Sequence, residues 1–126
     1  MLKKAYRLKS NIRIHQVRTS GSSWANRWVV LAKERGQAPQ CRFAFVVSKR
    51  IGGAVQRNRV KRVLREAVRQ RLPDIEPGWD VVVIARHPAR EASFEQINQA
   101  IVDVLKRAHL SPLETSVTRE DTSYKQ

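Results

Sequence analysis

The 126-residue chain has little of what protein catalysts and membrane proteins rely on. Its single cysteine, Cys41, excludes an internal disulfide and a cysteine-based zinc site. Its 11 acidic residues are scattered and its three histidines have no partner motif, so we predict no catalytic and no metal-binding residues. No apolar run approaches the roughly 20 residues that cross a bilayer, and none follows the basic N-terminus. We therefore expect a cytoplasmic protein with no membrane partner.

Positive charge is what the chain has in excess. It carries 25 lysines and arginines, a net charge of +14 and a pI near 11.2. Because these residues are spread over a folded-looking sequence, nucleic acid is the expected partner, and we predict no obligate protein partner. The length suits one domain, placed at residues 1–110, and the Ser/Thr-rich segment 111–126 is expected to be a disordered tail.

Hydrophobic periodicity predicts an α+β fold, a two-layer sandwich with a small mixed sheet in the order α-β-β-(β)-α-β-α. The expected elements are a helix from Ser10 or Asn11 to about Val17, a possible short strand at 23–25, strands at 28–32 and 42–47, a helix at 54–71, a strand at 81–85 and a helix at 94–109. Ser93 and Gln96 predict a capping box at the start of the last helix. The strands at 28–32 and 42–47 are expected to pair as an antiparallel hairpin.

The helix at 54–71 combines an apolar stripe with a cationic surface. The stripe recurs at helical spacing and consists of Val60, Leu64, Ala67, Val68 and Leu72. Between Lys49 and Arg71 the only acid is Glu66, among many lysines and arginines. A merely solvated face would carry mixed signs, so this surface predicts an anionic partner.

The same segment carries a more specific pattern. In order, it contains Ser48-Lys49-Arg50-Ile51-Gly52, Ala54-Val55, Arg57-Asn58-Arg59, Lys61-Arg62 and Arg65-Glu66. This pattern resembles the "RNR" signature of the bacterial ribonuclease P protein component, and the resemblance extends more loosely from about Tyr6 to His109. It implies a fold like domain 2 of ribosomal protein S5 with a left-handed β-α-β crossover. It also implies an endoribonuclease holoenzyme that removes the 5′ leader from precursor tRNA, in which catalysis belongs to the RNA subunit and Mg²⁺ at the active site is held mainly by RNA.

Two RNA-binding surfaces are expected. The catalytic RNA would contact the helix and the loop before it, through Lys49, Arg50, Arg57, Asn58, Arg59, Lys61, Arg62 and Arg65. The resemblance implies a cleft between the first helix and the sheet for the single-stranded 5′ leader, in the region of Ile14, Val17, Arg18, Arg27, Trp28 and Val30.

The chain departs from this family on its first helix. Family members often place phenylalanines there, whereas this chain has Ile14 and Arg18. Either Trp28 or Phe45 would then supply the aromatic platform, or the leader contacts would depend mainly on charge. Strand alternation would put Trp28 on the face shared by Val30 and Ala32, and we expect that face to line the cleft.

A second function remains open: a structural RNA-binding or ribosome-assembly protein could use the same basic helix without any role in cleavage. The full RNR order distinguishes the two, because a generic basic helix needs only charge. A protein-only nuclease is disfavoured by the scattered acids.

Overall fold

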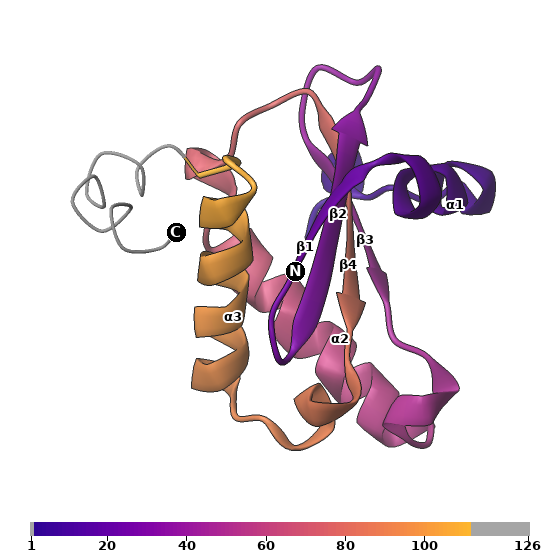
Figure 1. The fold of residues 1–126 in the computed structure, drawn as a ribbon, viewed down its shortest axis with the longest axis vertical. Coiled ribbons are helices and arrows are strands. Elements are labelled where there is room, and N and C mark those ends of the chain that lie inside the picture. Colours follow the sequence, from indigo (N-terminus) through magenta and orange to yellow (C-terminus); the bar gives the residue numbers. More distant parts are fainter. Residues whose placement is uncertain (1, 112–126) are drawn as a thin grey trace.

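The computed structural model describes residues 2–111, so the predicted disordered tail, apart from Ser111, lies outside the described residues. Its helices are α1 (Asn11–Ser20), α2 (Ala54–Arg69) and α3 (Phe94–Arg107), and its strands are β1 (Ser22–Ala25), β2 (Val29–Arg35), β3 (Arg42–Val46) and β4 (Trp79–Ala85) (Figure 1). Short 3-10 turns lie at Lys4–Tyr6, Lys49–Ile51, Leu72–Asp74 and His87–Glu91. The predicted α+β class and element order are confirmed, and β1 is the optional extra strand.

The four strands form one mixed sheet in the order β1-β2-β4-β3, in which only β3 and β4 are parallel. The predicted hairpin between 28–32 and 42–47 is therefore wrong, because β4 lies between β2 and β3. The reason lies in the apolar run of β4, where Val81, Val82 and Val83 are all fully buried. Such a run is most stable in the middle of a sheet, with a strand on each side and cover on both faces.

Helices cover the two faces of the sheet unequally. In Figure 1, α1 lies on one side of the sheet, and α2 and α3 lie on the other. The larger core joins α2 and α3 to one face of the sheet through residues such as Leu31, Phe43 and Val83. The smaller core packs Val17 of α1 against the opposite face, at Ala32, Ala44 and Val82. Because α1 is short, part of that second face is left open.

The start of α2 is shaped by two glycines. Gly52 has a φ of 149°, and a Cβ on it would lie 1.9 Å from the side-chain oxygen of Gln56, so only glycine fits. The Gly53 N–H donates to that same oxygen at 3.2 Å. The chain thus turns sharply from β3 into α2 with its amide groups satisfied.

The predicted faces of α2 and α3 are confirmed. Val60, Leu64, Ala67 and Val68 are the buried residues of α2, and Leu72 beyond its end packs against the same core. The Ser93/Gln96 capping box starts α3, with hydrogen bonds of 2.9 and 3.1 Å. The unit β3-α2-β4 is the predicted parallel crossover, and its left-handed sense remains what the resemblance implies. Between residues 2 and 111 no helix is both long enough and apolar enough to span a bilayer.

Candidate nucleic-acid interface

The outer surface of α2 presents cations without internal partners. Arg62 is exposed, and Lys61 and Arg65 are half-exposed beside it. Within residues 2–111, none of these three side chains makes a hydrogen bond or an ion pair. Lys49 and Arg50, on the turn before α2, and Asn58 on its first turns are exposed as well. These predicted RNA-binding residues therefore form one surface that is open to an anionic partner.

Two of the predicted RNA-binding arginines also support the fold. Arg57 Nε donates to the Gly52 carbonyl at 3.2 Å, and Arg59 Nη2 donates to the Ala92 carbonyl at 3.0 Å. Arg59 thus ties α2 to the loop that precedes α3. Both side chains are half-exposed, so each keeps further N–H groups for a partner.

The single acid of α2 does not cancel the free cations. Glu66 accepts two hydrogen bonds from Arg69, at 3.0 and 2.5 Å. These hydrogen bonds lower the pKa of Glu66 to about 2, so it is ionised at neutral pH and its charge is matched by Arg69. Arg62 and Arg65 keep their full positive charge toward solvent.

A hollow of about 400 Å³ lies between α1, the end of β3 and α2. Its walls are formed by Asn11, Ile14, His15 and Arg18 of α1, by Phe45, Val46 and Val47, and by Lys61. Ile14 and Arg18, two of the residues predicted to line the leader cleft, thus line this hollow. Lys61 belongs to α2, so the hollow is continuous with the cationic surface. We call this hollow the α1–β3 cleft.

Other predicted cleft residues lie elsewhere. Val17 is fully buried beneath α1, where it holds the helix on the sheet and has no surface to offer a ligand. Val30 pairs with Ile84 of β4, which pairs in turn with Val46. These three half-buried aliphatic residues form a row across the open part of the sheet, leading from the cleft toward β2.

The placement predicted for Trp28 is wrong. Trp28 precedes β2, so strand alternation does not apply to it, and its ring packs against the larger core rather than on the face of Ala32. The Arg27 guanidinium lies 5.7 Å from the centroid of the Trp28 ring. This pair sits at the turn between β1 and β2, outside the α1–β3 cleft.

Phe45, the other aromatic residue considered for the platform, does line the cleft. Its ring is half-buried and stacks on Phe43, with centroids 6.2 Å apart and an interplanar angle of 12°. Leu8 N donates to the Phe43 carbonyl at 2.8 Å, so the N-terminal segment covers the edge of β3 only at its start. The edge farther along, at Phe45, borders the cleft.

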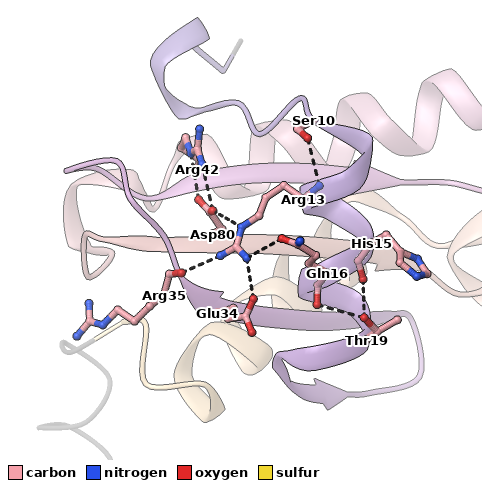
Figure 2. Close-up of polar contacts among 9 residues, drawn as sticks. All are labelled: Ser10, Arg13, His15, Gln16, Thr19, Glu34, Arg35, Arg42 and Asp80. Carbon is pink, nitrogen blue, oxygen red and sulfur yellow. Dashed lines mark hydrogen bonds and ion pairs between the residues drawn. The ribbon is translucent and has the colours of Figure 1, made fainter.

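A buried ionic cluster holds α1 over the sheet (Figure 2). Asp80, at the start of β4, is only 1% exposed and accepts hydrogen bonds from Arg13 Nε at 2.8 Å and from Arg42 Nε and Nη2 at 3.0 and 3.1 Å. Arg13 also donates to Glu34 at 2.7 Å and to the Arg35 carbonyl at 2.7 Å. We call Arg13, Glu34, Arg42 and Asp80 the Asp80 cluster. It connects α1 with β2, β3 and β4, and thereby fixes the helix that forms one wall of the cleft.

The cluster also keeps Asp80 ionised. Burial alone would raise its pKa, but the hydrogen bonds from Arg42 and Arg13 outweigh burial and lower the pKa below its usual value. Sequence reasoning missed the cluster. The available signal was a single acid, Asp80, directly before a run of apolar strand residues.

Comparison with known proteins agrees with this geometry. The sequence model of the Ribonuclease P family matches residues 2–109. The chain belongs to the ribonuclease P protein family. The ribonuclease P protein component of Roseiflexus castenholzii is 43% identical over 108 residues, covering 85% of this chain and 88% of the relative. That of Bacillus cereus is 36% identical over 119 residues, covering 94% of this chain and 100% of the relative.

Solved ribonuclease P proteins share the fold. The structure from Staphylococcus aureus has a TM-score of 0.78 at 35% identity and covers 86% of this chain and 99% of that one. The structure from Thermotoga maritima has a TM-score of 0.73 at 28% identity and covers 80% of this chain and 96% of that one. As a ribonuclease P protein component, the chain has its role in tRNA processing as a holoenzyme subunit, with the ribonuclease P RNA as its partner.

Side chains that could ligate a metal ion are not clustered in the described part of the chain. Between residues 2 and 111, no group of three histidine, cysteine, aspartate or glutamate side chains could hold a metal ion. The buried carboxylate of Asp80 is already saturated by two arginines. The thiol of Cys41 is buried, which raises its pKa to about 12 and keeps it protonated.

Proposed function

We propose that this protein binds both the ribonuclease P RNA and the 5′ leader of precursor tRNA, and that it thereby assists removal of the leader. The observation that carries the proposal is the continuity of two surfaces, since Lys61 belongs both to the cationic face of α2 and to the α1–β3 cleft. A catalytic RNA on α2 and a single strand in the cleft would lie side by side.

The face of α2 suits a structured RNA. Arg62 and Arg65 can form forked hydrogen bonds with phosphates, and Lys61 can act as a point charge. Their mutual repulsion costs a few tenths of a kcal/mol per pair in the free protein and is relieved when phosphates neutralise the face. The RNA therefore gains affinity from charges that weaken the isolated helix.

The cleft suits a single strand. Phe45 offers a ring on which a leader base can stack, and Ile14 and Val46 add apolar walls. Arg18 and Lys61, on opposite walls, can neutralise the phosphates on either side of that base. The platform is thus supplied by β3, in place of the first-helix phenylalanines.

In this proposal the chemistry belongs to the RNA subunit. Magnesium at the active site would be held mainly by RNA, and the protein would favour its binding by lowering the repulsion between RNA and substrate. Its own side chains bind and position the RNA, and none takes part in bond cleavage.

Reconstitution tests the proposal. The protein is mixed with a bacterial ribonuclease P RNA, and cleavage of precursor tRNA is measured at low magnesium with and without protein. We expect stimulation that is greater for substrates with a leader long enough to reach the cleft. Absence of stimulation would reject a role in cleavage and favour a purely structural RNA-binding protein, whereas cleavage without RNA would reject catalysis by the RNA.

A further inference from the structure

A second hollow, of about 460 Å³, lies between α2 and the start of α3. It is lined by Arg62, Val63, Arg65, Glu66 and Phe94 and does not share Lys61 with the α1–β3 cleft. Phe94 is 37% exposed and is one of three exposed large hydrophobic residues in the described part of the chain, with Ile12 and Val55. An aromatic ring is thus presented beside two free arginines.

The hollow is already formed in the protein alone. Phe94 is the first residue of α3 and follows the Ser93 cap, so its backbone position is fixed. Arg59 ties α2 to the Ala92 carbonyl at 3.0 Å, and Arg71, just beyond the end of α2, donates from Nη2 to Asn98 Oδ1 of α3 at 3.2 Å. These two bonds bracket the hollow and hold its walls apart at a set spacing.

The charge around the ring selects the kind of partner. Within residues 2–111, Arg62 and Arg65 make no hydrogen bond or ion pair, and Glu66 is neutralised by Arg69. A second copy of this chain, with a net charge of +14, would be repelled from such a face. A nucleotide combines an aromatic base with a negative phosphate and matches both features.

We propose that this hollow holds an unpaired nucleotide of the ribonuclease P RNA, with its base stacked on Phe94 and its phosphate against Arg62 and Arg65. The inference rests on the proposed function of α2 as the surface for that RNA. It extends the contact from the outer face of α2 around to α3, away from the leader cleft.

Affinity of the full-length protein for the ribonuclease P RNA, measured over a range of salt concentrations, tests this. Phe94→Ala should weaken binding by about 5- to 150-fold, the range for loss of one stacked base. Because no charge is removed, the slope of log affinity against log salt should stay the same. Phe94→Trp should preserve affinity, and Ile12→Ala, which removes an apolar residue that is 75% exposed on α1, should change nothing.

Three results would overturn the inference. If Phe94→Leu binds as well as the wild type, the site needs apolar volume rather than a ring. If Phe94→Ala binds normally while Arg62→Ala is weakened, α2 binds the RNA but the hollow does not, and a loss of self-association in Phe94→Ala would then assign the hollow to a second copy. If both variants bind normally, the proposed function of α2 fails and the inference fails with it. Melting temperatures identify any variant whose fold is damaged.

Discussion

Two arginine-rich regions of the molecule use the same side chain in opposite ways. In the Asp80 cluster, Arg13 and Arg42 converge on one carboxylate that is 1% exposed. On α2, Arg62 and Arg65 face solvent with no acidic partner among residues 2–111. The position of the acidic residues thus decides the role of an arginine. Arginines next to a buried acid stabilise the fold, and arginines without an acidic partner remain available to bind RNA.

The physical cost explains this division. A buried carboxylate is tolerated only when it is paired and hydrogen-bonded, so Asp80 needs both of its arginines. Exposed cations remain hydrated, and crowding them on one helix costs only a few tenths of a kcal/mol per pair. The chain can therefore leave α2 unpaired at little cost to stability, but it cannot do the same at Asp80.

The largest expected effect comes from breaking the Asp80 cluster. Asp80→Asn leaves two arginines without their shared charge, and we expect a loss of about 3 kcal/mol in the free energy of unfolding. This is the lower end for a buried pair, because Arg13 and Arg42 keep 23% and 30% exposure and can regain water. Urea denaturation measures it, with Glu66→Gln on the exposed ion pair of α2 as the matched control, which should show no change. Equal losses in both variants would contradict the distinction between the two regions.

The Asp80 cluster should also make the free energy of unfolding depend on pH. The folded-state pKa of Asp80 lies below the value of about 3.9 expected for the unfolded chain. Its contribution is therefore complete above that unfolded value and is lost as pH falls through the folded-state pKa. We expect the stability difference between wild type and Asp80→Asn to be constant from neutral pH to about pH 5 and to shrink below pH 4. A difference that stays constant down to pH 2 would mean that the stability loss comes from the altered hydrogen-bonding pattern of the amide, and not from the lost charge at Asp80.

The same two regions differ in how well the sequence predicted them. The α2 surface is local, so the spacing of Val60, Leu64 and Val68 was enough to predict its buried stripe and its cationic face. The Asp80 cluster joins residues 13, 34, 42 and 80, and nothing in local periodicity connects them. Strand pairing failed for a related reason, because chain proximity of β2 and β3 was taken as spatial proximity.

The cleft was predicted in part. Ile14 and Arg18 came from the resemblance and line it, whereas Trp28 was placed by extending strand alternation one residue beyond the true start of β2 at Val29. Alternation assigns faces only inside a strand, so an error of one residue at its boundary put the ring on the wrong side. Phe45 lies inside β3, so alternation does assign its face. Alternation does not show, however, that the edge of β3 is uncovered at Phe45.

Replacing the ring of Phe45 tests the cleft directly. Phe45→Leu keeps apolar volume but removes the stacking surface, so we expect affinity for precursor tRNA relative to mature tRNA to fall by about 1–3 kcal/mol in the reconstituted holoenzyme. Trp28→Leu is the matched control, since its ring lies outside the cleft and should affect stability rather than leader binding. If only Trp28→Leu lowered the affinity for precursor tRNA relative to mature tRNA, the stacking platform would lie at the β1–β2 turn instead.

Substitutions in the two arginine regions should also have different effects on the salt dependence of RNA binding. Arg62→Ala removes one phosphate contact, so the slope of log affinity for the ribonuclease P RNA against log salt should fall by about 1 while the melting temperature is unchanged. Arg13→Ala should do the reverse, lowering the melting temperature and leaving the slope as it is. An unchanged slope in Arg62→Ala would show that this face of α2 does not contact phosphates.

The smallest effect concerns the one acid on α2. Glu66 is partly exposed and its charge is matched by Arg69. Because Glu66 is not among the buried residues of α2, Glu66→Gln removes a negative charge and frees an arginine beside Arg62 and Arg65 without disturbing the core. We expect affinity for the ribonuclease P RNA to rise by about two- to threefold at low salt. The gain should disappear toward about 1 M salt, where the Debye length is only about 3 Å and exposed charges no longer act on one another. Filter binding at both salt concentrations measures it, and weaker binding at low salt would mean that Glu66, by holding Arg69 in place, positions a cation that the RNA needs.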